Sequence, residues 1–227
     1  MITESDIYTA GLYPYVKWQL DEFPSCLHRF CGKGYGLWQY PNQFAPYINL
    51  VATLNVKTYL EIGVGAGGTF MFTADALRMH GAKRFYAVDI APPGEVNYMN
   101  NDSSPFIGKL NQYMLENKDC SFHKGTIKDF IRENPLKEID LVLIDGDHSY
   151  KGCRSDFDDI NGIARIIAFH DISNMKCPGV RAVWNEVKVN PEYTAYEFTD
   201  QYEENVSFLG IGVLVKGKPC QNVLLSS

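Results

Sequence analysis

Hydrophobic residues in this chain form short, β-branched runs that alternate with stretches in which apolar positions recur at helical spacing. A run of five or six apolar residues is typical of a buried strand, and i, i+3, i+4 spacing is typical of a helix packed on a sheet. The pattern predicts seven strands, at residues 58–62, 85–89, 121–126, 139–144, 164–169, 193–198 and 208–215. Helices are expected at 70–80, 106–117, 127–133, 151–161 and 180–187, with another beginning at Pro41.

Strands that alternate with helices build a parallel sheet, whereas two final strands joined by a turn-rich link pair as an antiparallel edge. We therefore expect an α/β fold, a Rossmann-like sheet of seven strands that is mostly parallel, with an antiparallel C-terminal edge and helices on both faces. Residues 1–50 are expected to form a helical cap of the domain built by residues 51–227. In this cap Trp38, Gln39 and Gln43 either pack on the sheet edge or close over a ligand, and the polar loop 90–104 is either a lid or a surface insertion.

The first predicted strand opens into four glycines within six positions, a turn that leaves no Cβ between the strand tip and a ligand. Strand, glycine turn and helix form the first unit of a nucleotide-binding sheet. Asp89 ends the next strand, where a carboxylate binds ribose hydroxyls. The remaining residues expected around the cofactor are Gly63, Gly65, Gly67, Gly68, Thr69, Ile90, Thr126 and Asp145.

Two cofactors compete for this turn. G-x-G-x-x-G followed by Asp89 suits a dinucleotide, with its pyrophosphate at the helix N-terminus. Glu61 lies two residues before the first glycine, where a carboxylate disfavours a pyrophosphate and suits an ammonium and a sulfonium. The pattern E-x-G-x-G-x-G with a later Asp resembles the first two motifs of class I S-adenosylmethionine-dependent methyltransferases, so S-adenosylmethionine is the favoured cofactor.

Polar residues follow five predicted strands, and ligands of open α/β sheets bind beyond these carboxyl ends. The strand ends carry Glu61, Asp89, Gly125 with Thr126, Asp145 with Asp147 and His148, and His170 with Asp171. His148 is the candidate general base, since an imidazole accepts a proton near neutral pH and a hydroxyl is a poor nucleophile until its proton is removed. Asp147 or Asp171 would orient its ring; the structural alternative for His148 is to cap the helix that follows.

Three further stretches carry a closer resemblance. Leu-Ile-Asp-Gly-Asp-His-Ser-Tyr at 143–150, Phe-His-Asp-Ile at 169–172 and Pro-Gly-Val-x-x-x-Trp at 178–184 resemble the macrocin-type sugar O-methyltransferases and the proteins labelled cephalosporin hydroxylases. The resemblance covers about residues 57–187. It implies O-methylation of a small acceptor, often a sugar or glycan, and in the sugar-modifying members a divalent metal.

Position by position, the resemblance makes Asp145 and Asp171 catalytic or metal-binding residues and His148 the base. Macrocin-type enzymes have an acidic pair where this chain has His170–Asp171. His170 replaces a hard oxygen ligand by a nitrogen, which weakens the case for magnesium. Three alternatives therefore stay open for the metal. The site binds Mg²⁺ or Mn²⁺ with His170 as a third ligand, it binds a softer ion, or it binds no metal.

Composition and net charge limit the classes of substrate and partner that this protein is expected to bind. The net charge is −6 with no basic cluster, which disfavours a nucleic-acid substrate, and no apolar run has the length of a membrane span. Six cysteines without a C-x-x-C pair suggest reduced thiols and a cytoplasmic location. An oligomer is compatible with the sequence. The alternatives to a methyltransferase are an NAD-dependent oxidoreductase and a non-catalytic cofactor-binding module.

Overall fold

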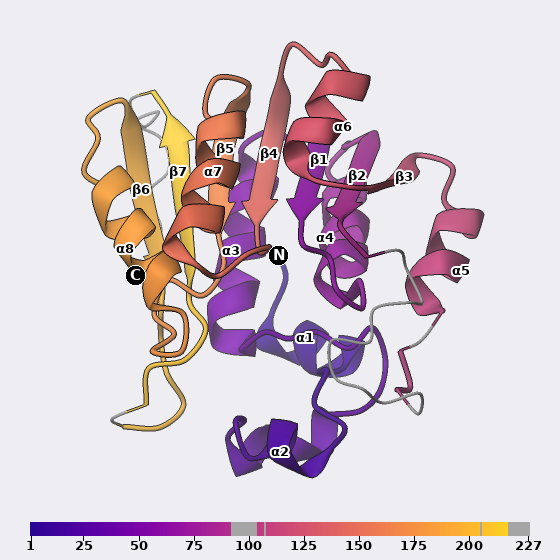
Figure 1. The fold of residues 1–227 in the computed structure, drawn as a ribbon. Coiled ribbons are helices and arrows are strands. Elements are labelled where there is room, and N and C mark those ends of the chain that lie inside the picture. Colours follow the sequence, from indigo (N-terminus) through magenta and orange to yellow (C-terminus); the bar gives the residue numbers. More distant parts are fainter. Residues whose placement is uncertain (92–103, 107, 205, 218–227) are drawn as a thin grey trace.

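A seven-stranded mixed sheet forms the centre of the protein in the computed structural model, which describes residues 1–91, 104–106, 108–204 and 206–217 (Figure 1). The spatial order of the strands is β3-β2-β1-β4-β5-β7-β6. The strands are β1 (Thr58–Ile62), β2 (Arg84–Asp89), β3 (Cys120–Lys124), β4 (Ile139–Ile144), β5 (Ala164–Phe169), β6 (Tyr193–Phe198) and β7 (Ile211–Lys216). The first five are parallel, and β7 pairs antiparallel with both β5 and β6. The fold class expected from the sequence is confirmed.

Most strand bounds agree with the hydrophobic pattern to within two residues, and β1, β4, β5 and β6 match it fully. The last strand differs, because it begins at Ile211 and not at 208. Leu209 and Gly210 both have positive φ angles, 56° and 97°, so the extended conformation starts only after them. Most of the loop 90–104, a lid or surface insertion by its sequence, lies outside the described residues.

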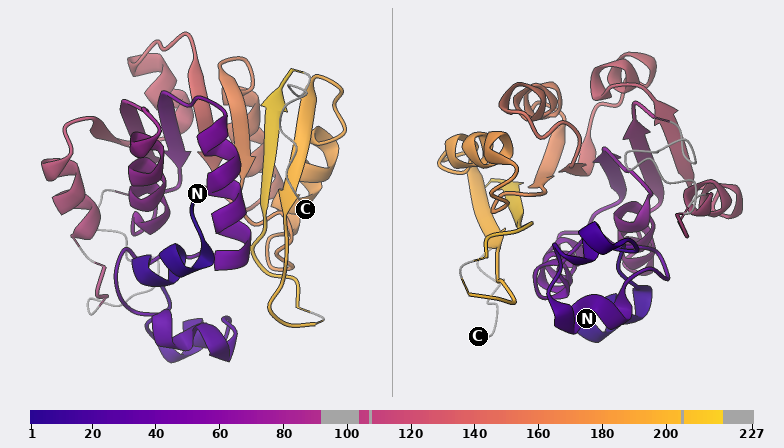
Figure 2. Two further views of the ribbon diagram at one scale, coloured as in Figure 1. Left: turned by 180° about the vertical axis from the view of Figure 1, so that it is seen from behind. Right: turned by 60° about the horizontal axis from the view of Figure 1, so that its bottom comes forward.

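Helices cover both faces of the sheet, so the molecule has three layers (Figure 2). The helices are α1 (Glu4–Ala10), α2 (Lys17–Leu20), the 3₁₀ helix η1 (Ser25–Phe30), α3 (Pro41–Thr53), α4 (Gly68–Met79), α5 (Lys109–Glu116), α6 (Ile127–Glu133), α7 (Tyr150–Ile160) and α8 (Pro178–Val187). Side chains of α3, α4 and α5 share one hydrophobic core with the N-terminal segment, and those of α6, α7 and α8 form a second core on the opposite face. Alternating inward residues of the buried strands supply both cores.

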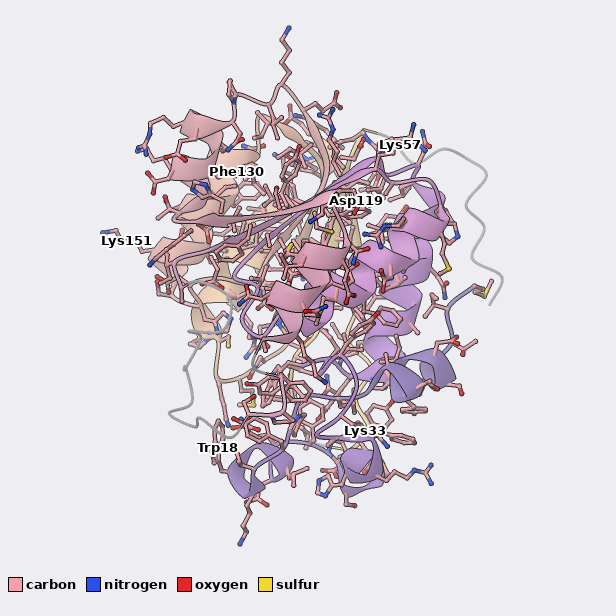
Figure 3. The ribbon with its side chains drawn as sticks, turned by 90° about the vertical axis from the view of Figure 1, so that its right-hand side faces the viewer. Trp18, Lys33, Lys57, Asp119, Phe130 and Lys151 are labelled. Atoms are coloured by element: carbon pink, nitrogen blue, oxygen red, sulfur yellow. The ribbon has the colours of Figure 1, made fainter. Side chains whose placement is uncertain are left out.

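The N-terminal segment lies beyond the carboxyl ends of the parallel strands (Figure 1). In Figure 3, Trp18 and Lys33 of this segment lie at one end of the molecule, and Lys57 and Asp119, which precede β1 and β3, lie at the other. Buried Ile7, Leu12 and Leu37 anchor the segment in the core it shares with α3 and α4. The strand ends, where ligands of such sheets bind, are therefore roofed by residues from the start of the chain.

Two further observations concern membrane-spanning helices and the state of the cysteines. Among the described helices, none has both the length and the apolarity needed to cross a membrane. Cys26, Cys31, Cys120, Cys153 and Cys177, which are the cysteines within the described ranges, are free thiols.

Candidate active site

The glycine turn after β1 has one glycine that faces open space. A Cβ added to Gly63 would lie 2.2 Å from the carbonyl oxygen of Asp145, and one added to Gly68 would lie 2.2 Å from that of Gly36. A Cβ on Gly67 would meet the Leu110 side chain at 2.8 Å. At Gly65, which has a φ of 51°, none of the described residues lies within 4 Å of the added Cβ. Three glycines thus permit close packing, and Gly65 leaves the kind of cradle that a ligand fills.

Asp89 connects this turn to the end of β2. Its side chain is 4% exposed; Oδ2 accepts a hydrogen bond of 3.1 Å from the Gly65 amide, and Oδ1 accepts one of 2.9 Å from the Ala91 amide. The carboxylate therefore lies beside the open position, as a ribose-binding residue would. Of the other expected cofactor residues, Ile90 is 67% exposed and Thr126 caps α6 by accepting from the Asp129 amide at 3.2 Å.

Glu61 is enclosed in the core, with 1% of the residue exposed. The hydroxyl of Tyr59 donates a hydrogen bond to its Oε2, and burial, followed by the charge of Glu61, raises the pKa of the nearby Tyr47 hydroxyl. Burial raises the pKa of Glu61 well above the usual range of a carboxyl group. Contact between Glu61 and a cofactor ammonium stays a prediction.

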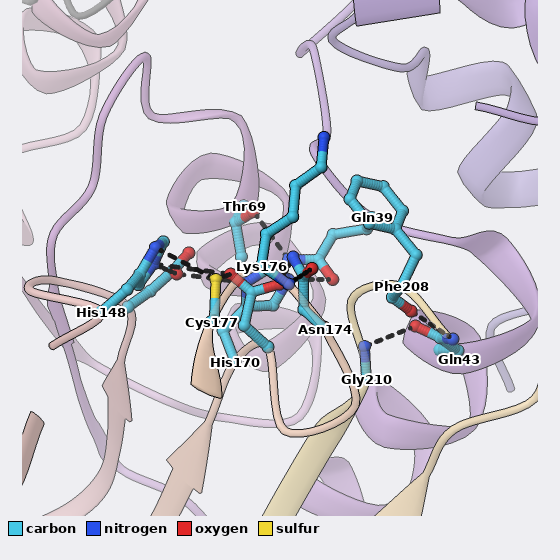
Figure 4. A network of polar contacts seen from close by, with 12 residues as sticks. Gln39, Gln43, Thr69, His148, His170, Asn174, Lys176, Cys177, Phe208 and Gly210 are labelled. Carbon is cyan, nitrogen blue, oxygen red and sulfur yellow. Dashed lines mark hydrogen bonds and ion pairs between the residues drawn. The ribbon is translucent and has the colours of Figure 1, made fainter. Parts of the chain in front are cut away.

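Two histidines and two aspartates meet beyond the ends of β4 and β5 (Figure 4). His148 Nε2 lies 3.4 Å from Asp145 Oδ1 and 3.5 Å from Asp171 Oδ2. His170 Nδ1 lies 3.1 Å from the same Asp145 oxygen and 3.4 Å from the same Asp171 oxygen. Asp147, the alternative partner for His148, instead accepts a hydrogen bond of 2.8 Å from the Ser149 amide. The sequence-predicted catalytic residues are therefore neighbours in the structure.

The charges of this cluster stabilise one another. Hydrogen bonding to Asp145, followed by that to Cys177, raises the pKa of His148 to about 11. Burial opposes a charge on His170, but the carboxylates of Asp145 and Asp171 outweigh burial and raise the pKa of His170. Burial likewise opposes the charge of Asp171, yet the His170 ring holds the pKa of Asp171 well below its usual range. These contacts favour the protonated form of both imidazole rings.

Asp171 is held in an unusual backbone conformation, with a φ of 63°. Left-handed geometry is uncommon outside glycine and concentrates at functional sites, where the surrounding structure enforces it. Asn174 supplies part of that enforcement, because its Nδ2 donates a hydrogen bond of 2.8 Å to Asp171 Oδ1. The strained backbone directs the Asp171 carboxylate at both histidines.

A chain of side-chain contacts links the cluster to the N-terminal segment (Figure 4). His170 Nε2 donates to Gln39 Oε1 at 3.1 Å, and Gln39 Nε2 donates to Thr69 Oγ1 at 3.3 Å. Gln39, which the sequence places over the ligand or on the sheet edge, is 1% exposed and touches the cluster itself. Asn174 and Cys177 were not expected at the site. Their position in the loop that directly follows the His170–Asp171 strand end was the signal available.

A divalent metal fits the donor set at the inner side of the cluster. Ligand atoms of Asp145, His170 and Asp171 all lie within 4.8 Å of one another. His170 Nδ1 is buried, and among the described residues its contacts with the two carboxylates lack hydrogen-bond geometry. An orphaned ring nitrogen between two carboxylates matches a mixed nitrogen and oxygen ligand set, as the sequence expectation for Asp145, Asp171 and His170 requires.

Comparison with known proteins agrees with this geometry. A family model described as a methyltransferase domain matches residues 60–172, which contain the glycine turn and both histidines of the cluster. The chain carries a methyltransferase domain. This match favours S-adenosylmethionine over a dinucleotide as the ligand of the glycine turn. No curated protein matches the sequence significantly.

Solved structures of O-methyltransferases and of an rRNA methylase show the same fold. An O-methyltransferase from Bacillus cereus in complex with SAH is 14% identical, with 94% of this chain and 98% of that chain covered and a TM-score of 0.56. CalS11, a TDP-rhamnose 3'-O-methyltransferase of calicheamicin biosynthesis, is 18% identical over 76% of this chain and 78% of its own, with a TM-score of 0.51. An rRNA methylase from Streptococcus thermophilus is 13% identical over 81% of this chain and 100% of its own, with a TM-score of 0.55. At these identities the likeness establishes the fold and leaves the acceptor open.

Proposed function

We propose that this methyltransferase transfers the methyl group of S-adenosylmethionine to a hydroxyl of a small acceptor, a sugar or glycan. The observation that carries the proposal is the meeting of His148 with Asp145 and Asp171, next to a glycine turn whose Gly65 faces open space. A proton acceptor beside a cofactor cradle is what hydroxyl methylation requires.

The bound cofactor supplies an electrophilic methyl group on a sulfonium. In the proposed site, Gly65 lets the backbone approach the cofactor, and Asp89 holds its ribose hydroxyls. His148 Nε2 would take the proton of the acceptor hydroxyl while the methyl group passes from sulfur to the hydroxyl oxygen, and S-adenosylhomocysteine would leave. Asp145 and Asp171 stabilise the imidazolium that results. His148 must first release the proton it carries at rest, and its side chain, 44% exposed, has a route to solvent for this.

The sugar assignment rests on three supports. The chain has a net charge of −6, which disfavours an anionic polymer as acceptor. The motifs at 143–150 and 169–172 resemble those of sugar O-methyltransferases, and one of the similar structures is a rhamnose O-methyltransferase. The third support is the N-terminal segment, because residues 1–50, proposed as a cap of the same domain, would cover the acceptor pocket.

Asp145, His170 and Asp171 are the residues that would hold a divalent cation. Such a cation would act as a Lewis acid that lowers the pKa of the acceptor hydroxyl. The nitrogen in this set favours Mn²⁺ over Mg²⁺, because imidazole is a poorer ligand for the harder ion.

The test is replacement of the base. His148→Ala is expected to lower turnover about 10²–10⁴-fold, with the affinity for S-adenosylhomocysteine (SAH) nearly unchanged. His148→Gln should not restore turnover, because an amide cannot take the proton. His80→Ala, an imidazole at the end of α4, is the matched control. Turnover is measured with S-adenosylmethionine and a panel of sugars and nucleotide sugars. Full activity of His148→Ala would refute the assignment of the base.

Two further measurements separate the alternatives. Binding of SAH and absence of NADH binding would exclude an oxidoreductase, and acceptor-dependent methyl transfer would exclude a non-catalytic binding module. Loss of activity after EDTA treatment, with recovery on addition of Mn²⁺ or Mg²⁺, would assign Asp145 and Asp171 as metal ligands. Activity that survives EDTA would limit these carboxylates to orienting the acceptor and His148.

A further inference from the structure

Cys177 lies against the catalytic cluster, in contact with His148 and Asp171. Its Sγ is 3.5 Å from His148 Nδ1 and 3.5 Å from Asp171 Oδ2. Cys177 is 6% exposed and Asp171 is 4% exposed, whereas the His148 side chain is 44% exposed. Ligand atoms of these three residues all lie within 4.8 Å of one another. A thiol, an imidazole and a carboxylate thus converge on one point that has a solvent-facing side.

The separations between these atoms are those of a tetrahedral metal site. Zinc binds sulfur at about 2.3 Å, and nitrogen or carboxylate oxygen at about 2.0–2.2 Å. At a tetrahedral angle, these bond lengths place a sulfur donor about 3.5 Å from a nitrogen or oxygen donor. The two distances from Cys177 Sγ, to His148 Nδ1 and to Asp171 Oδ2, are both 3.5 Å and match this separation.

The donor types select the ion. Thiolate and imidazole favour zinc and similar thiophilic cations, whereas magnesium prefers oxygen ligands and keeps much of its water. The three donors leave one tetrahedral position open, on the side where His148 is exposed. A buried thiol packed only among apolar residues would offer a cation neither a second donor nor a route of entry.

We propose that His148, Asp171 and Cys177 form a binding site for a thiophilic divalent cation of the zinc class. Binding replaces the S–H bond of Cys177 by a sulfur–metal bond, and the thiol proton passes to solvent. The cation would bind His148 Nδ1, the nitrogen beside Cys177, and the neutral ring then carries its proton on Nε2, so a bound zinc ion prevents Nε2 from accepting the proton of the acceptor. This inhibitory consequence rests on the proposed function, whereas the cation site itself does not.

Cobalt(II) is the direct probe, because it occupies zinc sites and gives a sulfur-to-metal charge-transfer band only when a thiolate is a ligand. Metal-free protein kept reduced with a phosphine is titrated with Co²⁺, and zinc affinity is measured by competition with a chromophoric chelator. We expect one equivalent of Co²⁺ per chain with a charge-transfer band. Cys177→Ser should remove the band and weaken zinc binding at least tenfold.

Cys26→Ser is the matched control, because Cys26 is an exposed thiol outside the cluster, and it should leave the band and the zinc affinity unchanged. His148→Ala provides a second variant that should also weaken zinc binding at least tenfold, in case Cys177→Ser does not fold. Cobalt binding without a charge-transfer band, or a band that survives in Cys177→Ser, would overturn the proposal.

Activity measurements separate the cation site from the proposed base. Zinc is expected to inhibit methyl transfer, with the inhibitory concentration raised at least tenfold in Cys177→Ser and unchanged in Cys26→Ser. Zinc bound with the charge-transfer signature of its cobalt substitute, yet without inhibition, would support the cation site and refute His148 as the base.

Discussion

Replacement of Gly65 by valine tests the cofactor cradle most directly, because stability and binding respond to different features of the position. Among the residues that the structure describes, none lies within 4 Å of a Cβ at Gly65, so the first side-chain carbon of valine meets no described core atom. The backbone φ of 51° is the remaining cost, about 2 kcal/mol for a side chain held in left-handed geometry. For a chain of this size, that free energy lowers the melting temperature by about 4–8 °C. The variant should therefore fold.

The affinity for SAH should fall for a different reason. Overpacking of a filled site costs about 1–3 kcal/mol, which corresponds to roughly 5- to 150-fold weaker binding. Calorimetric titration with SAH gives the affinity, and differential scanning calorimetry gives the melting temperature. Gly217→Val is the matched control, because Gly217 also has a positive φ, 96°, and no described residue lies within 4 Å of its Cβ position. Gly217 directly follows β7. The Gly217→Val variant should show the same loss of stability with full SAH affinity.

Two outcomes would refute this reasoning. If folded Gly65→Val binds SAH as tightly as the wild type, the open space beside Gly65 does not hold the cofactor. If Gly65→Val unfolds while Gly217→Val folds, Gly65 serves the packing of the turn, as Gly63 does.

Two other predictions follow from single carboxylates. Asp89→Ala should weaken SAH binding by roughly 1.5–3 kcal/mol, the range for a charged hydrogen bond, and unchanged affinity in calorimetry would remove Asp89 from the site. Burial, followed by the charges of Asp159 and Asp147, raises the pKa of the Asp156 carboxyl to about 6. The folded state therefore binds this proton more tightly than the unfolded state does. As a result, the free energy of unfolding falls as the pH rises from about 4 to about 6. Asp156→Asn should therefore stabilise the protein at pH 7.5 by about 1 kcal/mol, a value reduced from the full shift because the side chain is partly exposed, with little gain at pH 4.5. Urea unfolding at both pH values measures this, with exposed Glu138→Gln as control; an equal gain at both pH values would contradict the stated cause.

The sequence determined the features that depend on neighbours along the chain. Runs such as 139–144 and 164–169 are apolar because both faces of a central parallel strand are buried, so their bounds were predictable. The ends of these strands carry Asp145 and His170–Asp171, and parallel strands bring such ends to one edge. For this reason the meeting of His148 with Asp145 and Asp171 was predictable without coordinates.

Only the tertiary structure decided which of several similar residues face the ligand space. Four glycines look alike in sequence, yet three of them lie against Asp145, Leu110 and Gly36, whereas Gly65 has no neighbour at its Cβ position among the described parts of the chain. Glu61, at a strand end like Asp89, is enclosed by aromatic side chains of the core.

The partners of the catalytic cluster also depend on contacts between distant segments. Gln39 reaches His170 across 131 positions of sequence, and Cys177 meets His148 across 29. Strand periodicity and turn residues are set by local backbone preferences, which a sequence displays directly. Contacts between the N-terminal segment and a strand end depend instead on how two separately formed elements pack, because only packing brings those side chains within hydrogen-bond distance.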